Sequence, residues 1–180
     1  MDSREQKYVI ADTHFSEEPE IGRWLWALQD TRRRTMSGLE GLTQAIIDWL
    51  PPNNESSIGT VLYHIALIEV DWLYTEVLEQ PIPQEILALF PYDDRDEQGH
   101  LTQVRGFSLE QHLGRLESVR RLILDVFQQM NLDEFRRIRS LAEYDVSPEW
   151  VLHHWMQHEA EHRSQIGALR TAAARNLAQG

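Results

Sequence analysis

Residues 155–163, Trp-Met-Gln-His-Glu-Ala-Glu-His-Arg, have the pattern of the middle of a long C-terminal helix, and the fold and the function both depend on them. His158 and His162 are four residues apart, so in a helix they lie on one face, one above the other. Two imidazoles at that spacing can bind one metal ion, and His-Glu-x-x-His is the pattern of zinc metallopeptidases. A third ligand downstream would favour a peptidase, whereas one upstream would favour another class of protein.

The helix around these histidines is predicted to begin at Ser147-Pro148-Glu149, with an N-cap serine, a proline at the first helical position and an early acid. Apolar residues recur along it at helical spacing, and both histidines fall among them. The helix is therefore expected to lie in the core of a helical domain. The stripe consists of Val151, Trp155, His158, His162, Ile166, Leu169 and Ala173.

Three more amphipathic helices are predicted upstream. The first covers about 19–41 and has a short continuation over 43–50. The second covers about 57–79, and the third begins with a capping-box pattern at 108–111. Strand patterns are nearly absent, although 135–144 could be either a helix end or one arm of a small hairpin. The sequence therefore predicts an all-α four-helix bundle.

A long connection over 80–107 separates the second and third helices and carries Pro91, Gly99 and Gly106. It is expected to hold one short turn over 84–89. Connections of this length are usually crossovers or functional loops. The prediction is thus a four-helix bundle with a long crossover between helices 2 and 3.

Length and composition narrow the class of protein. The 180 residues suit one domain over 1–180, with 1–16 as an extended N-terminal arm. A net charge of −12 argues against nucleic acid as a partner. The apolar runs are interrupted by charges and no signal peptide is recognisable, so we expect no membrane span and a cytoplasmic protein. Because the chain has no cysteine, a transition metal must be held by histidine and carboxylate.

His64 is the upstream candidate for a third metal ligand, because it lies on or beside the buried face of the second helix. With His158 and His162 it would form a facial site for Zn²⁺, Ni²⁺, Mn²⁺ or Fe²⁺, with open positions for water or substrate. A peptidase is disfavoured, because Gln165 and Ala168 occupy the positions where a metzincin needs glycine and histidine, and no acid follows Glu161.

These residues resemble the DinB/YfiT-like family. The matching segments are Leu62-Tyr63-His64-Ile65-Ala66 and His158-x-x-x-His162-Arg163-Ser164-Gln165-Ile166, where the family commonly has His-Arg-Gly-Gln-Ile. The resemblance covers nearly the whole chain and includes Thr31-Arg32-Arg33-Arg34-Thr35. Ser164 departs from the family glycine, but it lies beside the ligands and leaves the metal prediction unchanged.

The resemblance implies a four-helix bundle with a divalent metal, usually zinc or nickel, at His64, His158 and His162. Characterised members resemble thiol-dependent transferases and isomerases that use a low-molecular-weight thiol. A small-molecule substrate is therefore expected, with the chain acting as a thiol-dependent S-transferase or as a metal-dependent hydrolase. The alternative is a non-catalytic metal-binding or stress-response protein with a structural metal site, so enzymatic activity stays an open question.

Two further residues are candidates for the site. Glu159 is a candidate catalytic base or second partner of a ligand imidazole, and Glu161 is considered with it. The alternative is that both are solvated helix acids. Arg32 lies in the apolar stripe of the first helix and is a candidate for binding the carboxylate of a cosubstrate, the alternative being a side chain that reaches solvent at the bundle edge.

Other histidines and tryptophans complete the predictions. His154 lies four residues before His158, so a 154/158 pair is a geometric rival; we favour 158/162 because His154 falls off the apolar stripe. His112 is expected to be exposed, with His14 and His100. Trp150 is expected to be partly exposed, at a pocket rim or at the interface of a homodimer.

Overall fold

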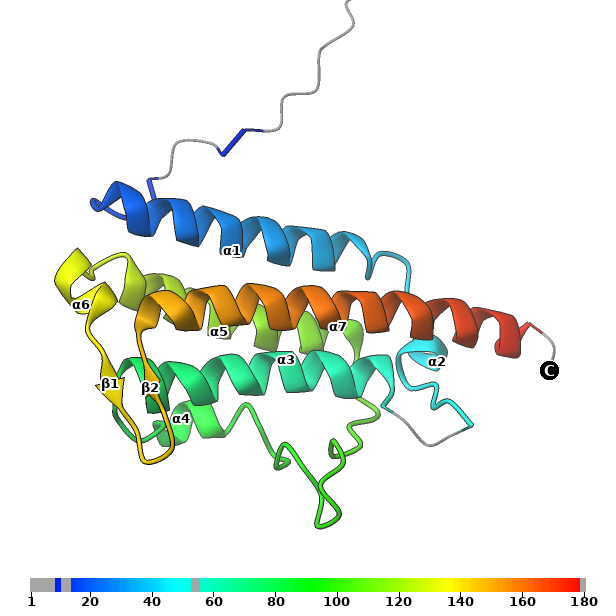
Figure 1. The fold of residues 1–180 in the computed structure, drawn as a ribbon. Coiled ribbons are helices and arrows are strands. Elements are labelled where there is room, and N and C mark those ends of the chain that lie inside the picture. Colours follow the sequence, from blue (N-terminus) through cyan, green and yellow to red (C-terminus); the bar gives the residue numbers. More distant parts are fainter. Residues whose placement is uncertain (1–8, 11–13, 53–55, 179–180) are drawn as a thin grey trace, which may run out of the picture.

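The computed structural model describes residues 9–10, 14–52 and 56–178, so most of the expected arm at 1–16 lies outside the described residues. The regular secondary structure of the described part is almost entirely helical, and its elements are shown in Figure 1. They are α1 (Pro19–Ser37), α2 (Gln44–Ile47), α3 (Ile58–Trp72), the π-helical turn η1 (Leu73–Val77), α4 (Gln84–Leu87), α5 (Leu109–Phe127), α6 (Leu132–Arg136), β1 (Arg139–Ser140), β2 (Asp145–Val146) and α7 (Pro148–Leu177).

The four long helices form a bundle in which α1 and α7 run in one direction and α3 and α5 in the other (Figure 1). Helix α3 packs against both α5 and α7, and α1 packs mainly against α7. Because α3 and α5 are parallel neighbours, the chain must return along the bundle between them, which explains the long connection. The predicted all-α bundle with a crossover between the second and third long helices is confirmed.

Three serines fix the starts of the long helices after α1. Ser57 Oγ accepts the backbone N–H of Thr60 at 3.1 Å and begins α3. Ser108 and Gln111 form the predicted capping box, with distances of 2.8 and 3.2 Å. Ser147 caps α7, and Pro148 stands at its first position. These side chains satisfy backbone donors that a helix start leaves without partners.

The crossover is fastened to α3 and α5 by side chains of those helices. Tyr63 Oη donates to the backbone oxygen of Tyr92 at 2.7 Å and accepts its N–H at 2.9 Å. Arg115 Nε donates to Leu89 O at 2.8 Å, and Thr60 Oγ1 accepts the N–H of Val104 at 3.0 Å. The crossover thereby covers a third side of α3, which explains why that helix is buried on nearly all faces.

His112 is buried under this crossover, so the expectation that it is exposed is wrong: its exposed fraction is 1%. Its ring lies 5.9 Å from that of Phe107. Burial, reinforced by the charge of Arg115, lowers the pKa of His112 to about 4. A Cβ on Gly59 would lie 3.1 Å from His112 Nε2, so the missing side chain of Gly59 allows this close contact.

Residues 135–144 contain both a helix end and the first strand of a hairpin, whose second strand is β2. Helix α6 ends at Arg136, and β1 then pairs antiparallel with β2 in the register Arg139 to Val146. The buried Arg139 guanidinium donates to Val77 O at 3.1 Å and so ties the hairpin to η1. The hairpin therefore sits over the end of the second long helix.

Glu76 in η1 is 3% exposed and accepts a hydrogen bond from Tyr144 Oη at 2.5 Å. Its other oxygen has no hydrogen-bond partner among the described residues. Burial, supported by the negative charge of Asp71 and opposed by the Tyr144 hydrogen bond, raises the pKa of Glu76 from 4.5 to about 7. The folded protein therefore holds a proton here between these pH values that the unfolded chain releases, and the protein loses stability as pH rises through this window.

Glu76→Gln is expected to remove this loss of stability at neutral and alkaline pH. The free energy of unfolding of the variant, relative to wild type, should rise by about 2–3 kcal/mol between pH 5 and pH 8. Urea denaturation at the two pH values measures the difference, and Glu97→Gln on the exposed part of the crossover serves as the control. A difference that is independent of pH would contradict the raised pKa.

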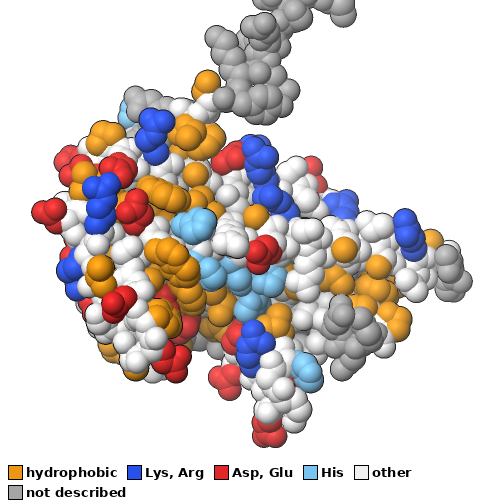
Figure 2. Space-filling view, viewed as in Figure 1, with side chains coloured by type: hydrophobic (Ala, Val, Ile, Leu, Met, Phe, Trp, Pro, Cys, Tyr) orange, Lys and Arg blue, Asp and Glu red, His pale blue; other side chains and the backbone are white. Residues whose placement is uncertain are grey.

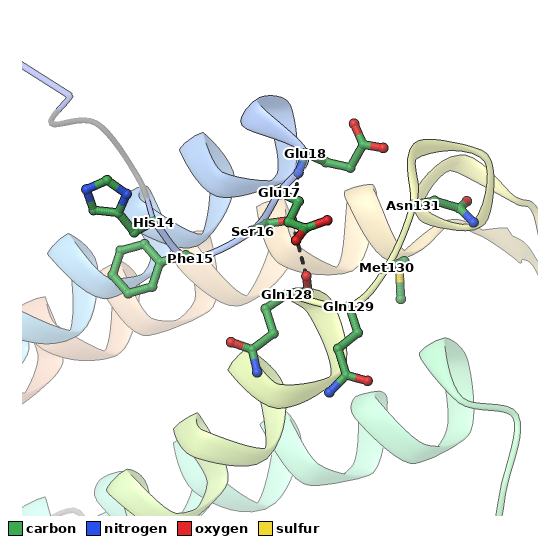
Figure 3. Close-up of a pocket in the computed structure, with 9 residues that line it drawn as sticks. All are labelled: His14, Phe15, Ser16, Glu17, Glu18, Gln128, Gln129, Met130 and Asn131. Atoms are coloured by element: carbon green, nitrogen blue, oxygen red, sulfur yellow. Dashed lines mark hydrogen bonds between the residues drawn. The ribbon is translucent and has the colours of Figure 1, made fainter.

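A cavity of about 600 Å³ lies between the start of α1 and the end of α5 (Figure 3). Phe15 and Met130 contribute to its walls, and Ser16 Oγ donates to Gln128 O at 3.4 Å across it. None of the residues predicted to form the site lines this cavity.

A search of the helices for a membrane-spanning segment, made over the described residues, finds none with the length and hydropathy that a span needs.

Candidate metal centre

His64, on α3, meets His158 and His162, on the antiparallel helix α7. His158 Nε2 lies 3.1 Å from His64 Nε2 and 3.0 Å from His162 Nε2. One ligand atom from each ring lies within 4.8 Å of the others. Three nitrogens bound to one ion at about 2.0–2.1 Å are about 2.8–3.4 Å apart at octahedral to tetrahedral angles. The group therefore has the spacing of a metal site.

The partners of two rings fix where the ring hydrogens lie. His64 Nδ1 is 2.5 Å from Asp94 Oδ1, and His162 Nδ1 is 2.9 Å from Gln165 Oε1. Both oxygens are acceptors, so the neutral rings carry their hydrogen on Nδ1 and a lone pair on Nε2. These lone pairs both face His158 Nε2, which carries at most one hydrogen. Acceptors that converge in this way suit a cation.

The electrostatic environment favours the neutral, metal-binding form of two of these rings, His158 and His162. Burial, with the neighbouring His162 and His64, lowers the pKa of His158 to about 3. Burial also lowers the pKa of His162, against the opposing effect of its hydrogen bond with Gln165. Neutral imidazole is the ligand that a divalent metal requires. The three rings therefore fit a divalent ion in geometry, and the lowered pKa values of His158 and His162 favour binding.

Asp94 is a member of the site that the sequence did not reveal. It lies in the crossover, thirty residues after His64, and the carboxylate–histidine pair that it forms is the usual outer support of a metal-bound imidazole. Arg95 Nε lies 3.5 Å from the other carboxylate oxygen of Asp94. The crossover contains several acids, and the sequence does not indicate which of them lies near His64. Only the path of the crossover over α3 places Asp94 there.

Asp94→Asn is expected to lower affinity for a divalent metal by about 10–100-fold, because it removes the charged acceptor that orients His64. Isothermal titration with Zn²⁺ or Ni²⁺ measures the change. Asp93→Asn, on the exposed neighbouring residue, is the matched control and should bind as wild type does. Equal affinities in the two variants would show that Asp94 does not support the site.

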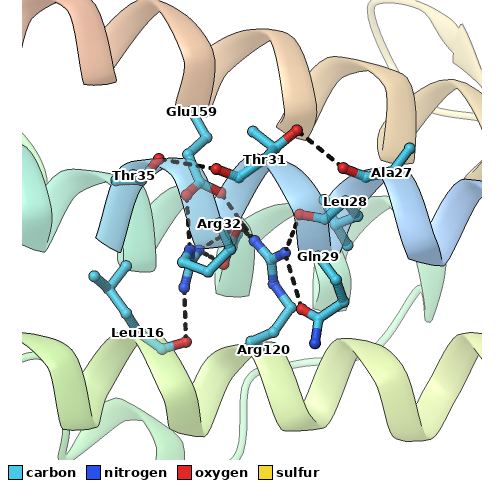
Figure 4. A network of polar contacts seen from close by, with 10 residues as sticks. Ala27, Leu28, Gln29, Thr31, Arg32, Thr35, Leu116, Arg120 and Glu159 are labelled. Carbon is cyan, nitrogen blue, oxygen red and sulfur yellow. Dashed lines mark hydrogen bonds and ion pairs between the residues drawn. The ribbon is translucent and has the colours of Figure 1, made fainter. Parts of the chain in front are cut away.

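Glu159 and Arg32 belong to a buried layer of four charges, one from each long helix (Figure 4). Arg32 on α1 donates to Glu159 Oε1 on α7 at 2.8 Å and to Glu69 on α3 at 2.9 Å. Arg120 on α5 donates to the same carboxylates, at 2.6 Å to Glu69 and 3.0 Å to Glu159. The layer balances two arginines with two glutamates inside the bundle.

Glu159 and Arg32 lie inside this buried layer, whereas each was expected either at a functional site or in contact with solvent. Glu159 is 0% exposed, so it is not a solvated acid, whereas Glu161 is exposed as that alternative predicted. Burial raises the pKa of Glu159, but Arg32 and Arg120 outweigh it and lower the pKa below its usual value. Both carboxylate oxygens are bonded to arginines, which does not suit a catalytic base.

Arg32 is likewise committed to contacts within the bundle. Its third nitrogen donates to Leu116 O at 3.0 Å, in addition to the two carboxylates. Its exposed fraction is 8%, so it does not reach solvent at the bundle edge. The expected contact with the carboxylate of a cosubstrate is replaced by contacts with Glu69 and Glu159. Both residues therefore stabilise the helices that carry the histidines.

His154, the rival ligand, is not part of the histidine group. Its ring stacks on Trp72 with the ring centroids 4.3 Å apart. Figure 2 shows the histidine side chains gathered on the face formed by α3 and α7, with hydrophobic side chains beside them toward the hairpin. The structure thus brings together the three histidines that the sequence analysis favoured.

The fold and the histidine group define a four-helix-bundle protein with a candidate three-histidine centre between two of its helices. The profile of the DinB superfamily matches residues 27–166, and the chain belongs to this superfamily. A search of curated proteins finds no significant match.

Among solved structures, the chain is similar to YfiT from Bacillus subtilis, described as a probable metal-dependent hydrolase with an unusual four-helix bundle topology. The two share 14% sequence identity with a TM-score of 0.59, and the match covers 96% of this chain and 94% of YfiT. At this identity the similarity shows the fold.

Proposed function

We propose that the chain holds a divalent metal ion, zinc or nickel, at His64, His158 and His162 and acts as a metal-dependent hydrolase on a small molecule. The observation that carries this proposal is the convergence of the three Nε2 atoms, with separations of 3.0 and 3.1 Å. Membership of the DinB superfamily and the description of YfiT as a probable metal-dependent hydrolase support it.

In this proposal the three histidines bind the metal, and Asp94 and Gln165 orient two of their rings. A bound divalent ion supplies a nucleophile at neutral pH by lowering the pKa of a water molecule or a thiol. Asp94 and Gln165 hold the rings of His64 and His162 with Nε2 directed inward. His158 and His162 are partly exposed, so a small molecule can approach them from solvent.

A second candidate is a thiol-dependent S-transferase; the absence of cysteine is compatible with this activity and equally with hydrolysis. The chain has no cysteine, so a reacting thiol would have to come from a low-molecular-weight cosubstrate. The same centre could activate that thiol, because a metal lowers the pKa of a bound thiol as it does that of water. The two candidates differ in whether activity requires an added thiol.

The test begins with protein purified without a histidine tag and reconstituted with Zn²⁺ or Ni²⁺. Loaded protein is expected to hydrolyse an activated ester, or to conjugate an added thiol to an electrophilic bimane, and His162→Ala should abolish the reaction. One bound equivalent with neither reaction, and a lower melting temperature after chelation, would indicate a structural metal. Less than about a tenth of an equivalent after reconstitution would overturn the metal centre.

A further inference from the structure

Aromatic side chains of α3 and α7 continue the row of rings beyond the histidine group. On α7, Trp150 and His154 precede His158 at successive intervals of four residues, so the three lie on one ridge with steps of about 6 Å along the axis. On α3, Trp72 follows His64 by eight residues. Because the two helices are antiparallel, Trp72 lies opposite Trp150 and His154, just as His64 lies opposite His158.

The rings of Trp72, His154 and Trp150 form an aromatic ledge. His154 lies 4.3 Å from Trp72 at an interplanar angle of 14°, and 5.1 Å from Trp150 at 7°. The two tryptophan rings are 5.7 Å apart at 19°. The ring of His154 is in turn 6.0 Å from that of His158 at 29°. The ledge is therefore continuous with the histidine group.

The outer end of the ledge is open to solvent. Trp150 is 47% exposed, and Ile138 and Tyr144 on the neighbouring hairpin are 64% and 45% exposed. The three side chains contribute to the walls of a cavity of about 500 Å³. Figure 2 shows hydrophobic side chains on this side of the histidines. Contiguous exposed apolar surface of this kind commonly marks a binding site.

Packing of the bundle does not account for this exposure. Trp155, on the inner face of the same helix, is 0% exposed and contacts Phe127 edge-on, with the ring centroids 6.0 Å apart. That residue secures α7 to the core. A half-exposed tryptophan contributes much less hydrophobic free energy to folding than a fully buried one. A ligand that covers the ring of Trp150 therefore explains its exposure better than a role in packing.

We propose that the aromatic ledge binds a flat aromatic group of the substrate whose reacting group lies at the three-histidine centre, an inference that rests on the function proposed above. His154 and Trp150 are one and two helical turns from His158, about 6 and 12 Å along the axis. The substrate class is therefore a small molecule in which a linker of a few atoms joins an aromatic ring to a hydrolysable or electrophilic group. Aromatic rings stack favourably at such a surface.

The test compares three metal-binding hydroxamates on Zn²⁺-loaded protein: acetohydroxamate, 3-phenylpropanohydroxamate and its cyclohexyl analogue. Titration calorimetry measures the affinities, and tryptophan fluorescence reports contact with the ledge. The phenyl compound is expected to bind about tenfold more tightly than acetohydroxamate and to quench the fluorescence. The cyclohexyl compound should have an affinity between those two.

Trp150→Ala and, separately, His154→Ala should remove most of this advantage in affinity and leave the affinity for acetohydroxamate unchanged. Trp26→Ala, on α1, is the control and should retain it.

Each other outcome overturns the inference in a recognisable way. Equal affinities for the phenyl compound and acetohydroxamate in wild type would leave the metal function standing and exclude the ledge. An unchanged advantage in Trp150→Ala, together with conversion of a dimer to a monomer, would show that a second copy of the chain covers the ledge. Absence of bound metal and of binding by any hydroxamate would overturn the proposed function itself.

Discussion

Replacing His158 with alanine is expected to lower the affinity for Zn²⁺ or Ni²⁺ by on the order of a hundredfold to a thousandfold. Its Nε2 lies between those of His64 and His162, at 3.1 and 3.0 Å, so its loss leaves two donors with no third to close the site. Wild-type protein should also gain melting temperature on metal addition, because the ion binds the folded state only. The variant should lose this gain.

His154→Ala is the matched control for that substitution, since it removes an imidazole one helical turn away on the same ridge. It should keep one equivalent of metal, because His154 stacks on Trp72 and lies outside the histidine group. Metal analysis after gel filtration and thermal unfolding with and without metal measure both effects. If His154→Ala loses the metal while His162→Ala keeps it, the wrong pair of histidines has been identified.

Arg120→Met is expected to destabilise the protein by about 3–5 kcal/mol, because removing one partner of a buried ionic group leaves the others uncompensated. Arg120 is 4% exposed and bonds both Glu69 and Glu159, so Arg32 alone would then face two buried carboxylates. Chemical denaturation measures the loss. Arg121→Met, on the exposed neighbour, should change stability by less than about 0.5 kcal/mol.

Replacing all four charged residues of the layer together tests whether the layer has a structural role and no catalytic one. A variant in which Arg32, Glu69, Arg120 and Glu159 all become apolar residues of similar size should recover much of the stability that Arg120→Met loses. It should also retain bound metal, because none of the four residues belongs to the histidine group. A single substitution that costs under about 1 kcal/mol would contradict the role given to the layer.

Local sequence signals predicted much of the fold. The serine caps at Ser108 and Ser147 and the proline at 148 have the predicted roles, because a cap depends on residues within one turn. The stripes at helical spacing located the four long helices. The short helix over 84–87 also falls within the turn predicted for the crossover.

Contacts between distant residues could not be predicted in the same way. His112 is buried because the crossover folds over it, and Glu159 is buried because arginines from α1 and α5 meet it across the bundle. A helical pattern gives the face on which a residue lies but does not name its partner. For the same reason, Glu159 and Arg32 were expected at a functional site and lie in a structural layer.

The sequence by itself determined the four helices and the long crossover. It also determined the three candidate ligands His64, His158 and His162. All of these follow from periodicity, capping and spacing along one chain. Only the tertiary structure decided that the crossover passes over α3. That path places Asp94 against His64, and the antiparallel packing of α3 and α7 places Trp72 against His154. Both contacts join residues far apart in the chain, and only the packing of whole helices sets the distances between them.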